Sequence, residues 1–129
     1  MANSELIEHS ARALHSSLER GEITPLDCLD ALEARIAQVD PQVNALPTLC
    51  FDRAREHARR LMGKPVAERG VLGGIPVAIK DLTNVAGVRS TQGSPIFANY
   101  IPDTSDLMVE HIEAEGGVIY AKSNTPEFG

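Results

Sequence analysis

Apolar residues recur at helical spacing through the first third of the chain. One stripe comprises Ile7, Ala11, Leu14 and Leu18. This spacing predicts a single amphipathic helix that stops at Gly21. Thr24 then stands where an N-cap is needed, with Pro25 at the first helical position. A second stripe follows, and Asp40-Pro41 predicts the end of this second helix.

A short apolar run and a third helix come next. Ala45 to Phe51 predicts a strand, and Asp52 predicts the N-cap of a helix that ends near Gly63. Residues 1–69 are therefore expected to be mostly helical.

The pattern changes at Gly70, where apolar runs become short and β-branched. Ile75 to Ile79 is apolar at every position, which is typical of a strand buried on both faces inside a parallel or mixed sheet. Pro76 should lie at the beginning of that strand, where a missing N–H matters least.

A second strand follows after a long loop and a helix. Thr104-Ser105-Asp106 should open the helix, with Leu107, Met108 and Ile112 available for burial. Val118 to Ala121 then predicts the next strand, beside the first. Strand, helical crossover and strand is the order found in α/β sheets.

The predicted fold class is therefore α/β, with N-terminal helices leading into part of a mixed, helix-covered sheet. Residues 70–129 carry the strand, loop, helix and strand. Because Gly129 comes soon after a predicted strand with no closing helix, we expect residues 1–129 to be an N-terminal fragment of a single larger domain.

Composition and charge narrow the classes of function. The net charge of −6 and the pI of about 5.1 argue against a nucleic-acid partner that relies on a basic surface. The first ten residues carry Glu5 and Glu8 and no apolar run, so we expect no leader, no membrane association and a cytoplasmic location. Cys28 and Cys50 form no C-x-x-C, so we expect no metal and no cofactor. His57 and His111 are expected on helix surfaces.

Lys80 is the strongest candidate for chemistry. It directly follows the apolar strand and opens the irregular stretch 81–103. In open α/β sheets, sites gather beyond the carboxyl ends of strands. An unperturbed lysine has a pKa of about 10.4 and is neutral in only about one molecule in 2,500 at pH 7. A desolvated lysine can become a usable base, whereas pairing with Asp81 or contact with solvent would make Lys80 structural.

Two common lysine motifs do not fit this segment. Residues 77–80, V-A-I-K, match the kinase motif in letters, but no correctly spaced glycine-rich loop precedes them and no H-R-D or D-F-G follows. A P-loop requires glycine before the lysine, and Ile79 is there.

A longer pattern does fit. The matching segments are G-V-L-G-G-I-P-V-A-I-K-D at 70–81, V-A-G-V at 85–88, T-Q-G-S at 91–94, D-T-S-D at 103–106 and G-G-V-I-Y-A-K-S-N-T-P-E-F-G at 116–129. Together they resemble the amidase-signature family. Val71, Ala121 and Ser123 depart from the family pattern, and none of these departures touches Lys80.

The resemblance implies a serine hydrolase that cleaves carboxylic amides. In that family a lysine acts through a bridging serine to deprotonate a nucleophilic serine. By this likeness Lys80 is the lysine, and both serines would lie beyond Gly129. Thr91, Gly93 and Ser94 are the candidates for contact with a small-molecule amide. The Ser94 hydroxyl is expected to order its loop rather than to act as a nucleophile.

Two alternatives stay open. One is the A-type subunit of a tRNA-dependent amidotransferase, which releases ammonia from glutamine. Thr125-Pro126-Glu127 is closer to a free amidase, because M-D-E is usual in the amidotransferase. The other is a non-catalytic module that binds a partner or forms a homo-oligomer.

Overall fold

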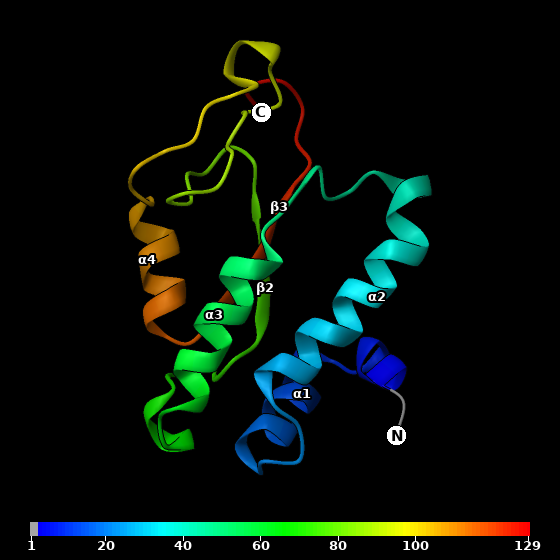
Figure 1. Ribbon diagram of the computed structural model, residues 1–129, viewed down its shortest axis with the longest axis vertical. Helices are drawn as coiled ribbons and strands as arrows, with labels where there is room; N and C mark the ends of the chain where they lie inside the picture. The colour runs from blue at the N-terminus through cyan, green and yellow to red at the C-terminus, as the bar shows by residue number, and fades with distance from the viewer. Residues whose placement is uncertain (1–2) are drawn as a thin grey trace.

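The structure is a computed structural model that describes residues 3–129, with side chains from residue 5 onward. Its elements are η1 (Asn3–Glu8), α1 (Ala11–Glu19), α2 (Pro25–Val43), β1 (Thr48–Leu49), α3 (Phe51–Met62), η2 (Val66–Glu68), β2 (Pro76–Lys80), η3 (Pro95–Phe97), α4 (Leu107–Ala114) and β3 (Val118–Ser123). Figure 1 shows β3 in the middle of these elements, among α2, α3 and α4.

The first helix predicted from the sequence is in fact two. η1 ends at Glu8, and the Ser10 side chain then accepts a hydrogen bond from the Ala13 N–H at 3.2 Å, which starts α1. The serine offers a capping oxygen to unpaired N–H groups, and this local bond competes with a continuous helix. The predicted stop is confirmed, because the helix ends before Gly21, whose φ is +69°.

α2 begins as the sequence predicts and ends later. Thr24 and Asp27 form a reciprocal capping box, with bonds of 3.1 and 2.8 Å. The helix runs through Pro41 to Val43, so the predicted end at Asp40-Pro41 is wrong. A proline this near the C-terminus removes one helical bond. The Asp40 carboxylate fixes the chain after the helix by accepting from the N–H groups of Ala45 and Leu46.

Two further expectations for this region are corrected. The strand predicted from Ala45 to Phe51 is only β1, because Phe51 already begins α3. Asp52 is not the cap: Cys50 holds that position without a side-chain bond, and Asp52 lies in the first turn. An acidic residue there still interacts favourably with the helix dipole.

The sheet is mixed and has β3 at its centre. β1 pairs with β3 antiparallel and β2 pairs with β3 parallel, so the order is β1-β3-β2. The predicted pairing of Val77 with the second strand is confirmed, because Val77 lies opposite Ile119. The expectation that this strand is interior and largely buried is wrong for the described chain. β2 is an edge strand there, and Val77 and Ala78 are only half-buried.

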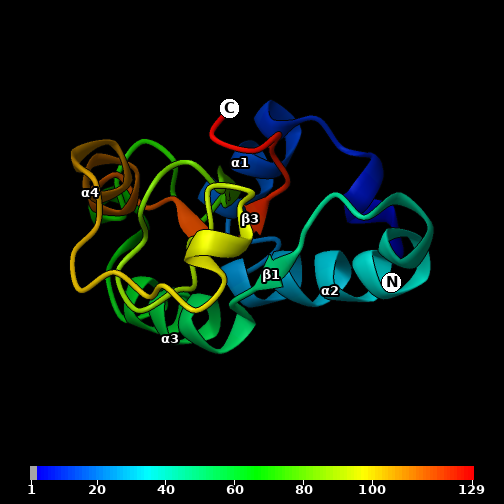
Figure 2. The same ribbon diagram turned by 90° about the horizontal axis from the view of Figure 1, so that it is seen from above.

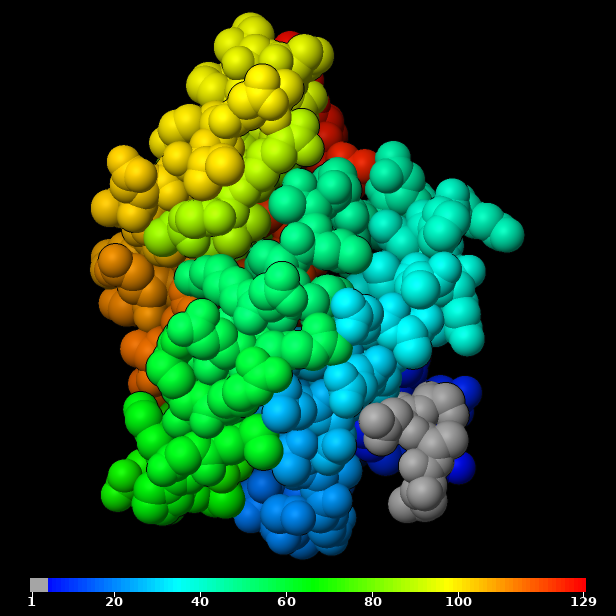
Figure 3. Space-filling model, viewed as in Figure 1, coloured from blue at the N-terminus to red at the C-terminus, as the bar shows by residue number. Residues whose placement is uncertain are grey.

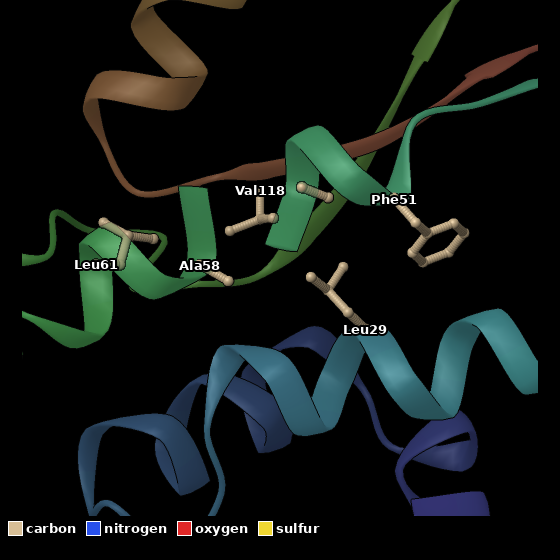
Figure 4. Close-up of a cluster of buried hydrophobic side chains, with 6 residues drawn as sticks. Leu29, Phe51, Ala58, Leu61 and Val118 are labelled. Atoms are coloured by element: carbon tan, nitrogen blue, oxygen red, sulfur yellow. The ribbon is translucent and has the colours of Figure 1, made fainter. Parts of the chain in front are cut away.

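Each face of β3 packs against a different layer. Val118 joins a cluster made with α2 and α3, which Figure 4 shows closing around Leu29, Phe51 and Leu61. Ile119 points the other way, into a cluster with Ile79 and with Val109 of α4. Alternate side chains of one strand thus fill both layers, which is the helix-covered α/β arrangement predicted from the sequence.

Of the three α4 residues predicted for burial, only Ile112 packs against the core. Leu107 and Met108 are exposed, whereas Val109 is fully buried and Ile112 packs beside it. Because the helix begins at Leu107, its inward stripe starts at Val109.

Candidate functional site

Lys80 lies at the carboxyl end of the two parallel strands. It is the last residue of β2, opposite Ser123 of β3, and its side chain is exposed. Asp81 donates its N–H to the Ser123 carbonyl at 2.9 Å, so the chain leaves both strands at the same level. Figure 2, viewed from above, shows the loop that contains η3 and the C-terminal segment close together over this end of the sheet.

Asp81 turns inward, away from the exposed position of Lys80. The residue is 2% exposed, and its carboxylate accepts hydrogen bonds from the Thr91 N–H and, at 2.5 Å, from the Thr91 hydroxyl. It also accepts from the Lys122 ammonium at 2.9 Å. The cation that pairs with this carboxylate is therefore Lys122, and the alternative in which Asp81 pairs with Lys80 is not what the structure shows.

Lys122 is fully buried in β3. Its Nζ donates to Asp81 and, at 2.7 Å, to the Ser90 hydroxyl, which in turn donates to the Val88 carbonyl. Removing one partner from a buried ion pair costs about 3–5 kcal/mol, because the other charge is left unpaired. The pair therefore ties β3 firmly to the loop that follows β2.

Sequence reasoning did not single out Lys122. A simple alternation from Val118 would place it on the α2 and α3 side of the sheet. The register shifts between Val77 and Ala78, however, and leaves Tyr120 of β3 without a partner in β2. One extra residue of this kind reverses the face to which the following side chains point. A lysine inside an apolar strand, with an aspartate after the neighbouring strand, was the available signal.

The Thr91–Ser94 segment is folded against both strand ends. The Gln92 N–H donates to the Asp81 carbonyl, and the Phe128 N–H donates to the Gln92 carbonyl, each at 2.8 Å. Gly93 has a φ of +68°, and a Cβ there would lie 2.8 Å from the Thr125 carbonyl oxygen. Glycine is thus required by conformation and by close approach.

Ser94 is a buried loop-ordering residue. Its side chain is 4% exposed, and its hydroxyl accepts a hydrogen bond from the Ile96 N–H at the start of η3. This is the role expected for it from the sequence.

The structure brings the candidate substrate-contacting residues to one hollow. A pocket of about 290 Å³ is bordered by Pro47, Thr48, Asp81, Arg89, Thr91, Gly93, Ser94, Pro95, Ala98 and Asn124. In the space-filling view, the loop that contains η3 (yellow) forms the upper end of the molecule, with C-terminal residues behind it (Figure 3). Thr91 donates both its N–H and its hydroxyl to Asp81. Of the three candidates, only Gly93 is classed as exposed.

The histidines behave differently from one another. His111 is exposed as expected, but His57 is 8% exposed and lies on the buried side of α3, so the surface assignment is wrong for it. Its Nδ1 is 3.6 Å from a Glu113 carboxylate oxygen. Across residues 5–129, no three His, Cys, Asp or Glu side chains are grouped so as to hold a metal ion.

No helix in the part of the chain that the structure describes is both long and apolar enough to cross a membrane.

Comparison with known proteins gives the family. The family model described as Amidase matches residues 27–129, which is most of the chain. The chain belongs to the amidase family. The resemblance drawn from the 70–81 and 116–129 segments is thereby confirmed.

Curated relatives of this amidase-family chain are much longer than it is. It is 41% identical over 113 residues to the A subunit of a glutamyl-tRNA(Gln) amidotransferase from Roseiflexus sp. (strain RS-1), covering 87% of this chain and 23% of that one. A protein of the same name from Geotalea daltonii is 36% identical over 126 residues, covering 96% of this chain and 26% of its own. The chain thus spans about a quarter of the length of these relatives.

Solved structures share the fold. A bacterial aryl acylamidase of the amidase-signature enzymes superposes with a TM-score of 0.83 at 26% identity, over 94% of this chain and 26% of its own. An amidase family protein from Bacillus anthracis str. Ames superposes with a TM-score of 0.85 at 22% identity, over 97% of this chain and 26% of its own. The α/β prediction, with a mixed sheet covered by helices, is confirmed.

Proposed function

We propose that the full-length protein hydrolyses a small carboxylic amide and that Lys80 is its general base. The main observation in support is that the two lysines at one end of the sheet, Lys80 and Lys122, have different environments. Lys122 is buried and holds the Asp81 carboxylate, which leaves Lys80 unpaired with Asp81 at the end of β2, where it is exposed in these 129 residues. Membership of the amidase family supports the same reaction class.

The proposed reaction follows the family's chemistry. The neutral Lys80 amine accepts a proton, through a bridging serine, from a nucleophilic serine whose oxygen attacks the amide carbonyl. The C–N bond breaks, and the leaving amine takes up the proton. Water then attacks the acyl-enzyme with the same base assisting, which releases a carboxylic acid and restores the serine. Both serines are supplied by sequence outside these 129 residues, so residues 1–129 contribute the base and one wall of the site.

The pocket residues are proposed as that wall. Thr91, Gly93 and Ser94 would shape the space for the substrate, with Gly93 allowing the loop to pack against the backbone of Thr125 and Pro126. Residues 1–129 would then be the N-terminal part of one larger domain, in a cytoplasmic enzyme that needs no cofactor.

Two substitutions at Lys80 test this function. In the full-length protein, Lys80→Ala should reduce turnover of a panel of simple amides by about 10²–10⁴-fold, as is typical of a lost general base. Lys80→Arg should not restore turnover, because a guanidinium does not give up its proton near neutral pH. Lys64→Ala, at an exposed lysine after α3, is the matched control. Near-parental turnover in both Lys80 variants would make Lys80 structural.

A second candidate function is supported by the names of the curated relatives. Two of them, at 41% and 36% identity, are A subunits of glutamyl-tRNA(Gln) amidotransferases. The same lysine chemistry could therefore serve to release ammonia from glutamine for a tRNA-bound acceptor. Thr125-Pro126-Glu127 favours the free amidase.

Partner dependence separates the two candidates. A free amidase should cleave several amides as a purified single protein. A component of a transferase should act on glutamine and require further subunits and charged tRNA for transfer. If glutamine is the only amide cleaved, and its turnover rises only when such partners are added, the second function is favoured.

A further inference from the structure

Three separate segments are joined by one buried ionic group. Lys122 comes from β3, Asp81 from the residue after β2, and Ser90 and Thr91 from the following loop. Lys122 is fully buried and Asp81 is 2% exposed, so water contributes little to either charge. The hydrogen bonds of 2.7 and 2.9 Å from Lys122 fix both acceptors relative to β3.

Stability alone is a weak reason for such a pair. Taking two charges out of water costs several kcal/mol per ion, and well-packed apolar residues of similar volume are often equally stable. What an ion pair adds is direction, because each donor must meet its acceptor at a defined distance and angle. In this protein, the ion pair fixes the path of the chain at Lys80 and Asp81.

Asp81 is covalently next to Lys80, and the two side chains point to opposite sides. Lys80 is the last residue of β2 and is exposed, whereas Asp81 begins the turn that follows and is buried. Holding the Asp81 carboxylate inside therefore holds the Lys80 side chain outside, at the strand end. Lys122 also occupies the carboxylate of the residue adjacent to Lys80, which is then not free to serve as a counter-ion for Lys80.

We infer that Lys122 is a positioning residue for Lys80, acting through Asp81 in two ways. It fixes the direction in which Lys80 leaves β2, and it keeps the Asp81 carboxylate from pairing with Lys80. This inference rests on the proposed role of Lys80 as the base. Among the described residues, the Lys122 ammonium bonds to Asp81 and Ser90, so its proposed effect on Lys80 is indirect.

A serine-directed probe measures the effect without knowledge of the substrate. The full-length protein is treated with a fluorophosphonate, and the rate constant of labelling is followed across the neutral and alkaline pH range. The rate reports activation of the serine, and the midpoint of its pH profile reports deprotonation of the base. Arg89, which borders the pocket, is the same in every variant.

Lys122→Met should leave the Asp81 carboxylate without its cation, so that it is free to attract Lys80. An opposite charge within a few ångströms favours the charged form of a lysine by about one pH unit or more. The midpoint should therefore move to higher pH, and labelling at neutral pH should slow by about tenfold or more. The double variant Asp81→Asn/Lys122→Met removes both charges, and the new amide oxygen can still accept from Thr91, so its midpoint should return towards that of the parent.

The return of the midpoint separates positioning from mere structural support. If Lys122→Met and the double variant slow labelling equally with an unmoved midpoint, Lys122 supports only the fold and the inference is wrong. An unchanged rate in Lys122→Met also overturns it. Should Lys122→Met lose its cooperative melting transition, Ser90→Ala removes only one acceptor of the ammonium, and a smaller shift in the same direction is expected. An unmoved midpoint in Ser90→Ala and in the double variant would then count against the inference.

Lys80→Ala, measured in the same series, keeps the two hypotheses apart. If Lys80→Ala labels as fast as the parent, the proposed function fails. If Lys80→Ala is slow while the Lys122 variants match the parent in rate and midpoint, only the positioning role fails. Lys64→Met, at an exposed lysine, should behave as the parent in both measurements.

Discussion

His57 of α3 is buried beside Glu113 of α4. Burial lowers the pKa of His57, and the Glu113 carboxylate opposes that change only in part. The carboxylate is shared, because Arg53 donates to both of its oxygens at 2.8 and 3.0 Å. The Glu113 carboxylate oxygen lies 3.6 Å from the His57 Nδ1, which is beyond hydrogen-bond distance. The histidine is therefore expected to stay neutral in the folded protein.

This histidine should make folding sensitive to acid. The unfolded chain takes up a proton at His57 near pH 6.5, whereas the folded chain does so only at lower pH. The unfolded state therefore binds more protons in that window, and the contribution of His57 to stability, complete above about pH 6.5, is lost as the pH falls. In thermal melts of the full-length protein, His57→Gln should weaken the fall in melting temperature on mild acidification.

His111→Gln is the control for that measurement. It changes an exposed histidine on α4 and should leave the acid-induced fall as it is in the parent. An identical fall in His57→Gln and the parent would mean that other groups dominate the acid response.

At the scale of single elements, the capping box of α2 is the clearest local determinant. Thr24 and Asp27 together satisfy two N–H groups at the helix start. Thr24→Ala should lower the free energy of unfolding by about 1 kcal/mol. Thr24→Ser retains the capping oxygen and should lose much less. The measurement is urea unfolding of the three proteins, and equal losses in both variants would show that the hydroxyl is not what matters.

Two turns meet where the sheet begins, and glycine is essential there. At Gly116, where φ is +83°, a Cβ would lie 2.0 Å from the Arg69 carbonyl oxygen. Gly116→Ala should therefore destabilise the fold by at least about 2 kcal/mol, since backbone on both sides would have to move. Gly21 has a similar φ of +69° with nothing within 4 Å, so Gly21→Ala isolates the cost of the conformation alone. A Gly116→Ala loss no greater than that of Gly21→Ala would contradict the steric argument.

Some features governed by neighbouring residues were predictable from the sequence, whereas the Ser10 cap between η1 and α1 was missed and some features governed by distant contacts were not predicted. The Thr24 cap and the Gly21 stop depend on atoms a few residues away, and both are found as predicted. The partners of Lys122, by contrast, lie 32 and 41 residues away. The buried place of His57 is set by α4, which lies far along the chain.

On the scale of the whole molecule, apolar surface is left uncovered. Ile96 is 77%, Val71 72% and Leu107 65% exposed, and β2 has an unpaired outer edge within the described chain. Such surfaces and strand edges favour association between copies. Residues 1–129 produced alone should therefore self-associate with rising concentration, as followed by light scattering after size-exclusion chromatography. A monomer at every concentration would contradict this.

The same short chain should be inactive. A triad whose members act as a unit loses many powers of ten when its nucleophile is removed. Residues 1–129 alone should hydrolyse amides no faster than buffer does, as measured by ammonia release. Serine-dependent turnover by this chain, free of longer protein, would mean that the base and nucleophile have been misassigned.

The central strand of this sheet is also its last. Within residues 3–129, β1 and β2 have no strand partner until Val118–Ser123 lies between them. During synthesis, the apolar face of the preceding helices that packs against β3 therefore stays uncovered until β3 has been made. Pairing between strands that are far apart in the sequence is also slow to form. Nascent chains halted before Val118 should be digested quickly by protease, and protection should appear together across α2, α3 and β2 once Ser123 has emerged. The order of these elements along the chain thus becomes an order of events in time, in which β3 completes the sheet of residues 3–129.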